Sequence, residues 1–302
     1  MFIITHRNWF FALTGIITVA ALAAALAWGL RLGTDFTGGT LVEASYEGTR
    51  PLGSELSASL TQAGISDFSL REAGEHGYIL RAGTLSDAAR GALPDAFSLG
   101  GRYAAQIGSQ SEVGPTIGAE LRTKALLAIV LVILCILLFI AFAFRKVSQP
   151  VSSWVYGLIA LVTLVHDVIV PVGFYAALGH FAGAEADTLL VTAILTVLGF
   201  SIHDTIVVFD RVRENLAVNK ERNRKEPFEE TAGRALGQTF VRSVNTSLTV
   251  VITLAILFFL GPDSTRWFSL TLLVGIVAGT YSSIFLATPL LVSAAGRVKP
   301  KK

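Results

Sequence analysis

Six long apolar runs dominate the pattern of hydrophobic and polar positions along the chain. Each has about as many residues as, or more than, the roughly 20 that an α-helix needs to cross the hydrocarbon core of a bilayer. The runs cover residues 8–30, 125–144, 151–178, 188–209, 243–260 and 267–295. The first is longer than the ~7 to 15 apolar residues of a cleavable signal peptide. The pattern therefore predicts a polytopic membrane protein with six transmembrane helices, the first of them retained.

The segment between the first two apolar runs has a different periodicity. Short stretches with strand-like alternation lie at 40–47, 68–72, 78–81 and 103–109. Helical stretches lie at 54–63 and 86–97. The order strand, helix, strand, strand, helix, strand is that of a ferredoxin-like split unit. We therefore predict one α+β ferredoxin-like domain, residues 31–124, between transmembrane helices 1 and 2.

Charge places these elements relative to the membrane. The connections after the second and fourth apolar runs and the C-terminal tail are rich in Lys and Arg, whereas the connections after the third and fifth runs hold only Arg266. The basic residues are Arg145, Lys146, Arg211, Arg213, Lys220, Arg222, Arg224, Lys225, Arg234, Arg297, Lys299, Lys301 and Lys302. By the positive-inside rule, both termini are predicted to be cytoplasmic and the α+β domain extracytoplasmic.

This organisation divides the chain into four parts. Residues 1–30 form the cytoplasmic N-terminus and first helix, and residues 31–124 the outer domain. Residues 125–296 form a five-helix bundle with a basic cytoplasmic loop at 210–241, and 297–302 a basic tail. Composition agrees with a membrane class, since 52% of the 302 residues are hydrophobic and 15% are charged.

Catalytic and metal-binding patterns are weak. Ser201, His203 and Asp204 contain the letters of a catalytic triad, but they lie too close together on one helix to align in series. The single cysteine, Cys135, cannot form an intrachain disulfide. The histidines and aspartates have no dedicated metal-ligand spacing. We expect no enzymatic activity, no metal, no cofactor and no nucleic-acid partner.

Two carboxylates fall well inside the predicted transmembrane helices. Asp167 and Asp204 each follow a histidine, in "LVHDVIVP" and "SIHDTIVV". An ionised carboxylate at the centre of a bilayer costs at least ~2.5 kcal/mol. Each must therefore be compensated or used, and Asp204, Asp167, His203 and His166 become candidate proton-handling residues.

Polar residues at helical spacing form a stripe on three of the predicted helices. The stripes are Ser201, Asp204 and Thr205 on the fourth helix, Tyr156, Thr163 and Asp167 on the third, and Arg242, Thr246, Thr249 and Thr253 on the fifth. Residues three and four apart share a helix face. Such stripes are how a bundle lines a hydrated path or satisfies buried ions.

Two interpretations of Asp204 and Arg242 remain open at this stage. In the first, they form a static ion pair that holds the bundle together, as intramembrane polar groups can. In the second, Asp204 binds and releases protons, because burial and a nearby cation act on a carboxyl group in opposite senses and make it switchable. Proton transfer by His203 or His166 also stays open, since adjacent residues on a helix point about 100° apart.

Five sequence blocks occur in the order expected for one family. They are "GTDFTGGTLVE" at 33–43, "VGPTIGAELRTKA" at 113–125, "HDVIV" in the third run, "GFSIHDTIVVFDRVREN" at 199–215 and "RSVNTSLTVV" at 242–251. Together they make the chain similar to the SecF family, whose members belong to the SecDF protein-export complex in the resistance-nodulation-division superfamily. The chain departs from the family pattern at His203, where the usual motif has Asn.

The resemblance implies a role in protein export driven by the proton gradient. SecF-family proteins pair with SecD into a twelve-span unit beside the SecYEG channel, in the lipid of the bacterial inner membrane. They use the proton motive force to help move unfolded chains across it. Carried over to this sequence, Asp204 would be the proton site, Arg242 its regulating cation and Asp167 a supporting polar group of the path.

Two further expectations concern movement and assembly. The segment from Gly33 to Thr40 would be the joint between first helix and outer domain, with Asp35 and the permissive glycines Gly33, Gly38 and Gly39. A small-residue face at Gly275 and Gly279 would support assembly with the SecD-like subunit.

Two other functions remain alternatives. A proton-driven half-transporter that exports lipids or drugs, from the same superfamily, would use the same intramembrane residues. A scaffold that only stabilises a channel would keep its activity after Asp204→Asn.

Overall fold

The chain forms two compact units in a computed structural model that describes residues 2–145 and 151–297. One unit holds the long helices and comprises the residues up to 31, 127–184 and those from 189 onward. The other comprises residues 32–126 and 185–188. Lys146 and the basic tail predicted beyond residue 297 lie outside the described residues.

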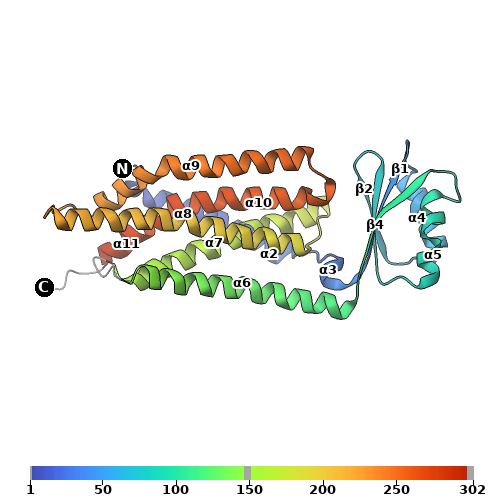
Figure 1. The fold of residues 1–302 in the computed structure, drawn as a ribbon, viewed down its shortest axis with the longest axis horizontal. Helices are drawn as coiled ribbons and strands as arrows, with labels where there is room; N and C mark the ends of the chain where they lie inside the picture. Colours follow the sequence, from blue (N-terminus) through green and yellow to red (C-terminus); the bar gives the residue numbers. More distant parts are fainter. Residues whose placement is uncertain (1, 146–150, 298–302) are drawn as a thin grey trace. The chain divides into compact units, whose positions relative to one another are not determined.

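The first unit is built from long helices that run side by side (Figure 1). After the short α1 (Phe2–Thr5), they are α2 (Arg7–Trp28), α6 (Pro115–Ala143), α7 (Ser153–Ala182), α8 (Thr188–Glu221) and α9 (Phe228–Leu260). The last span has three pieces: α10 (Asp263–Ser282), the π-helical turn η1 (Ser283–Ala287) and α11 (Thr288–Arg297). Six helices of the described chain are long and apolar enough to cross a membrane. The predicted number of spans is confirmed.

Three of these helices extend well beyond their apolar runs. Helix α6 begins ten residues before the predicted start at 125, α8 continues twelve residues past 209, and α9 begins fifteen residues before 243. Ion pairs within one helical turn support the polar extensions, as between Glu120 and Lys124 (2.7 Å) and between Arg211 and Glu214 (2.7 Å). Hydropathy therefore marks the apolar part of each helix and not its ends.

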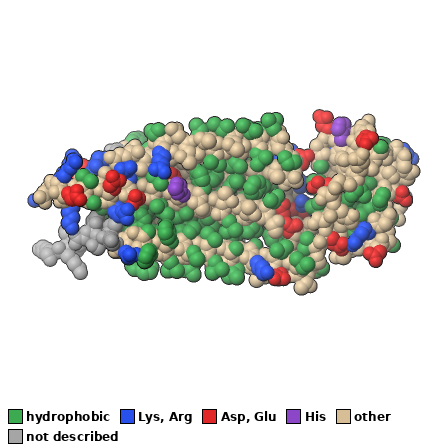
Figure 2. All heavy atoms as spheres, in the orientation of Figure 1, with side chains coloured by type: hydrophobic (Ala, Val, Ile, Leu, Met, Phe, Trp, Pro, Cys, Tyr) green, Lys and Arg blue, Asp and Glu red, His purple; other side chains and the backbone are tan. Residues whose placement is uncertain are grey.

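Helices α7, α8 and the last span form the interior of this unit. In α7 and in α8, half of the most apolar 18-residue stretch is buried, whereas in α2 and α6 only 6% of the corresponding stretch is buried. Large apolar side chains such as Trp9 and Phe139 are exposed instead, and Figure 2 shows apolar side chains over much of the visible face of the helical unit. Because α7 and α8 carry Asp167 and Asp204, both carboxylates lie in the interior.

Two glycines bring α10 against α8. A Cβ atom built on Gly275 would lie 2.2 Å from Cγ2 of Val197, and one built on Gly279 would lie 2.8 Å from Cβ of Ser201. Gly275 and Gly279 do form a close-packing face, but this face packs against α8 of the same chain. The expectation that this face serves the partner subunit is therefore wrong.

The second unit contains one antiparallel sheet and two longer helices. Its elements are α3 (Thr34–Thr37), β1 (Gly39–Tyr46), α4 (Gly53–Gln62), β2 (Phe68–Ala73), β3 (Gly77–Ala82), α5 (Asp87–Ser98) and β4 (Ala105–Val113). The strand order is β2-β3-β1-β4, and every neighbouring pair is antiparallel. The strands and the two longer helices follow the order that the sequence pattern predicts, whereas α3 was not expected.

Alternation along the central strand β1 builds the core of this unit. Val42, Ala44 and Tyr46 point inward and join side chains of both helices, among them Leu60 and Phe97. The Tyr46 hydroxyl donates a hydrogen bond of 3.0 Å to the carbonyl oxygen of Phe97. Burial raises the pKa of the Tyr46 phenol well above its ordinary value. This hydroxyl therefore stays protonated and acts as a fixed link between strand and helix.

Candidate functional site

Asp167 is fully buried in the interior of the helical unit, with 0% of its surface exposed. Its Oδ1 lies 2.8 Å from Nδ1 of His166 on the same helix. Its Oδ2 accepts a hydrogen bond of 2.8 Å from the Ser282 hydroxyl of α10 and another from the Ser201 hydroxyl of α8. Helix α7 thus presents a carboxylate to donors from two other helices.

Asp204 on α8 is the second buried carboxylate, with 8% of its surface exposed. Its Oδ1 accepts a hydrogen bond from the Ser243 hydroxyl of α9, and its Oδ2 accepts one from the Ser283 hydroxyl of η1. Within residues 2–145 and 151–297, neither Lys nor Arg forms an ion pair with Asp204 or Asp167. The donors that hold Asp204 are uncharged hydroxyls.

The sequence-based pairing of Asp204 with Arg242 is not present in this structure. Arg242 is exposed, as are Thr246 and Thr249, whereas Ser243 and Ser247 face the interior. Adjacent residues on a helix point about 100° apart, so the inward face of α9 is offset by one residue from the predicted stripe. A polar stripe at helical spacing does face the interior, but it contains Ser243 and Ser247 and not Arg242, Thr246 and Thr249.

The other predicted polar residues divide between the interior and the surface. Thr163 is buried and donates to the carbonyl oxygen of Ala160, 2.8 Å away. Ser201 and Thr205 share the buried face of α8 with Asp204, as predicted. Ser201, however, donates to Asp167, and the Thr205 hydroxyl has no hydrogen-bond partner among the described residues.

The two histidines have different surroundings. His166 is buried and contacts Asp167 through Nδ1, and its Nε2 has no partner in the described part of the chain. His203 is exposed on α8, although Asp204 beside it is buried. The structure therefore brings His166 to a carboxylate and leaves His203 on the outer surface of this single chain.

Sequence reasoning missed three serines that contact the carboxylates: Ser243, Ser282 and Ser283. The available signal was the pair of adjacent serines in "YSSIF", within an otherwise apolar span. A hydroxyl both donates and accepts hydrogen bonds, whereas an Arg side chain only donates. Hydroxyls can therefore satisfy a carboxylate and also a protonated carboxyl group, so this arrangement accommodates both protonation states.

The glycine-rich segment after α2 is held tightly within the second unit. Gly38 and Gly39 have φ angles of 79° and 133°, in the region that favours glycine. A Cβ atom on Gly39 would lie 2.4 Å from the carbonyl oxygen of Ala82. The amide of Gly33 donates to the carbonyl oxygen of Ala186, 2.7 Å away. No larger residue fits at Gly39 without moving β3.

Asp35 contacts Thr188, which is the first residue of α8 and belongs to the same unit as Asp35. Its Oδ2 accepts hydrogen bonds from the Thr188 amide (3.0 Å) and the Thr188 hydroxyl (2.7 Å). Arg81 of β3 also forms an ion pair with Glu185 just before that helix. The predicted joint residues Gly33, Asp35, Gly38 and Gly39 are therefore part of one hydrogen-bonded segment, and its role in movement stays a prediction.

Comparison with known proteins identifies the family. Residues 98–297 match the C-terminal family model of the protein export membrane proteins SecD and SecF, and residues 29–49 match the SecD/SecF GG motif. Among curated relatives, the chain is 43% identical to the protein translocase subunit SecF of Thermobaculum terrenum, covering 96% of this chain and 93% of the relative. It is 36% identical to that of Pseudomonas aeruginosa, covering 95% and 89%.

The chain belongs to the SecD/SecF family. The crystal structure of SecDF from Thermus thermophilus, described as a translocon-associated membrane protein, superposes with a TM-score of 0.82 at 31% identity. The match covers 97% of this chain and 38% of that SecDF chain. This SecF-family chain is therefore a multi-pass inner-membrane protein, and the resemblance stated from its motifs is confirmed.

A separate polar network joins α8 and α9 of this SecF-family chain where the two helices are linked. Arg234 donates to Glu226 (2.6 Å) and to the side-chain oxygens of Asn215 (3.0 Å) and Asn219 (3.3 Å). Asn219 and Thr231 also donate to Glu226. The Arg234 and Asn219 hydrogen bonds lower the pKa of Glu226 to about 2. Glu226 is therefore ionised near neutral pH and acts as a fixed link of the hairpin.

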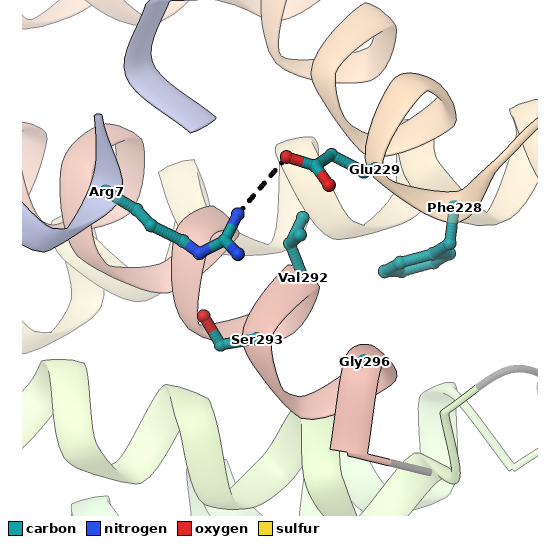
Figure 3. Close-up of a pocket in the computed structure, with 6 residues that line it drawn as sticks. All are labelled: Arg7, Phe228, Glu229, Val292, Ser293 and Gly296. Carbon is teal, nitrogen blue, oxygen red and sulfur yellow. Dashed lines mark hydrogen bonds and ion pairs between the residues drawn. The ribbon is translucent and has the colours of Figure 1, made fainter. Parts of the chain in front are cut away.

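An ion pair close to this network connects the first residue of α2 to α9. Nη1 of Arg7 lies 3.2 Å from Oε1 of Glu229, at a cavity of about 400 Å³ that Figure 3 shows in close-up. Val292, Ser293 and Gly296 of α11 line the cavity together with Phe228. Both side chains are partly exposed, so we regard the pair as a surface contact and not as a site.

Proposed function

We propose that this chain is a SecF-type auxiliary subunit of the Sec protein translocase and couples the proton motive force to late steps of protein export. It works with a SecD-like subunit beside the SecYEG channel and acts on unfolded chains in transit. Both termini are cytoplasmic. The sheet-containing unit is a ferredoxin-like domain outside the cytoplasm.

The observation that carries this proposal is the environment of Asp204 and Asp167. Both carboxylates are buried, and their polar neighbours are hydroxyls and one histidine. A static ion pair would favour a single charge state, whereas hydroxyl donors favour neither to the exclusion of the other. Movement of one proton across 100 mV releases ~2.3 kcal/mol, which is enough to bias a rearrangement of a few hydrogen bonds.

Arg242 and His203 lie on the outer face of the bundle, where the proposal places the contact with the SecD-like subunit. Both are exposed in the single chain, and an exposed Arg or His on a transmembrane face is costly in lipid. The SecD-like subunit covers this face of α8 and α9, together with Thr246 and Thr249. Arg242 approaches Asp204 in a second state, because a rotation of α9 by about 100° exchanges Ser243 for Arg242 at the carboxylate.

The test is export in inverted membrane vesicles that contain the full translocase, with and without a proton gradient. Asp204→Asn keeps the shape of the side chain and removes the titrating group. We expect ATP-driven translocation to continue and the gradient-dependent part to disappear, while Asp204→Glu keeps part of it. A gradient response of Asp204→Asn equal to that of wild type would refute the proposal and favour a scaffold role.

A further inference from the structure

Two consecutive serines in the last span contact both buried carboxylates. Ser282 is the final residue of α10 and Ser283 the first residue of η1, and neither side chain is exposed. Ser282 donates to Asp167 of α7 and Ser283 to Asp204 of α8. One dipeptide unit therefore bridges two acidic residues that lie on different helices.

The helix geometry at this point is unusual. An α-helix changes here into a π-helical turn, a feature that occurs frequently at functional sites. The carbonyl oxygen of Ser283 accepts a hydrogen bond of 3.4 Å from the Thr288 hydroxyl, five residues later. The backbone change thus begins at the residue that contacts Asp204.

Each serine also has a second acceptor within its own helix. The Ser282 hydroxyl lies 3.0 Å from the carbonyl oxygen of Gly279, and the Ser283 hydroxyl lies 3.0 Å from that of Thr280. A hydroxyl has one proton, so it donates fully to only one acceptor at a time. Each serine therefore has two alternative donor positions, toward a carboxylate or toward its own backbone.

The other two serines at the site differ in this respect. Ser201 and Ser243 donate to Asp167 and Asp204, and neither has a backbone acceptor in the described structure. Among the described residues, the carboxylate is the one hydrogen-bond acceptor of each of these two hydroxyls. The contrast separates donors with one acceptor, on α8 and α9, from donors with two acceptors, where α10 passes into η1.

We propose that Ser282 and Ser283 form a two-position hydroxyl switch that couples the protonation of Asp204 to that of Asp167. This inference rests on the proposed function. When Asp204 is ionised, Ser283 donates to it. When Asp204 takes up a proton from the aqueous path, Ser283 turns its own proton to the carbonyl oxygen of Thr280 and accepts the new carboxyl O–H.

No serine O–H bond breaks in this switch, because the Ser283 hydroxyl only rotates from one acceptor to the other. The proton that Asp204 gains comes from water and returns to water when Asp204 ionises again. Coupling arises because the two serines are adjacent on one backbone. A backbone shift that accompanies the new Ser283 hydrogen bond therefore also changes the distance between the Ser282 hydroxyl and Asp167. His166 is the titratable side chain in hydrogen-bond contact with Asp167. His203 and Arg242, the neighbours of Asp204 and Ser243 in sequence, are exposed.

The experiment follows both carboxyl groups by infrared spectroscopy in the intact complex with its SecD-like subunit. The protonated C=O band of each is assigned by its loss in Asp167→Asn and Asp204→Asn. We expect Asp204→Asn to shift the titration midpoint of Asp167 by about half to one pH unit, which corresponds to the net free energy of one hydrogen bond. In a Ser283→Ala background, Asp204→Asn should no longer shift the titration midpoint of Asp167. In a Ser283→Thr background, which keeps a hydroxyl, the shift should be present.

Ser243→Ala is the matched control, because it also deletes one hydroxyl donor to Asp204 but leaves the adjacent pair intact. It should change the midpoint of Asp204 and preserve the coupling to Asp167. Equal coupling in Ser283→Ala and wild type would overturn the switch, as would equal loss in Ser283→Ala and Ser243→Ala. Either result leaves the proposed function standing if Asp204→Asn still abolishes the gradient-dependent part of export.

Discussion

The helices α8 and α9 meet at two polar clusters, each of which contains one carboxylate with different hydrogen-bond donors. At the link between the helices, Glu226 accepts hydrogen bonds from the guanidinium of Arg234, from Asn219 and from Thr231. Further along the same helices, Asp204 accepts hydrogen bonds from two serines. A fixed cation holds Glu226 in one charge state, whereas hydroxyls leave Asp204 able to change. The difference separates a structural link from a switchable site.

Neutralisation of one carboxylate from each environment gives the largest contrast. Asp167→Asn, in the hydroxyl-lined site, should lower the gradient-dependent part of export about tenfold, since a lost charged hydrogen bond of ~1.5 kcal/mol corresponds to that factor. Glu226→Gln should lower it by less than about twofold, because Glu226 lies at the link between α8 and α9 and its hydrogen-bond partners are Arg234, Asn219 and Thr231, away from both intramembrane carboxylates. The measurement is vesicle export with and without a gradient. Equal losses in the two variants would mean that the two clusters do not differ in role.

Packing behind the hydroxyl-lined site gives an intermediate effect. In Gly279→Ala the added methyl group would meet Ser201, which donates to Asp167, so the donor must move. We expect a several-fold loss of gradient-dependent export, with a cost of about 1 to 3 kcal/mol for overpacking. Thermal stability of the purified complex and vesicle export are the two measurements.

Gly15→Ala is the control for this substitution, because a Cβ atom on Gly15 has no neighbour within 4 Å. It should leave both stability and export unchanged. If Gly279→Ala behaves in the same way, the close contact between α10 and α8 does not position Ser201.

The comparison also shows which features a sequence can reveal. Six apolar runs and the strand alternation in residues 31–124 predicted the elements, because burial in lipid and in a sheet each imposes a period. Asp167 and Asp204 were found because a carboxylate is rare in an apolar run. The phase of α9 was missed, since polar residues occupy both the face with Arg242 and the face with Ser243, and spacing does not tell which face is inward.

The serines of η1 were harder to predict for a different reason. A serine in an apolar helix commonly bonds to its own backbone, so "YSSIF" alone does not point to a ligand. Its meaning depends on Asp167 and Asp204, which lie 115 and 79 residues earlier in the chain. A π-helical turn has no sequence signal comparable to a cap or a proline.

The pH dependence of the α8–α9 link gives the smallest expected effect. The pKa of Glu226 is about 2 in the folded protein against an ordinary value of 4.5, so ionisation stabilises the hairpin above pH 4.5 and this contribution is lost as the pH falls toward 2. A spin label at Lys225→Cys, in a Cys135→Ser background, should therefore keep constant mobility from pH 5 to 8 and become more mobile between pH 4.5 and 2. In Glu226→Gln the label should be mobile throughout, with no transition in that window. A change in mobility between pH 5 and 8 in the otherwise unmodified hairpin would show that the link titrates in the range where export operates, and the distinction between a fixed and a switchable carboxylate would not hold.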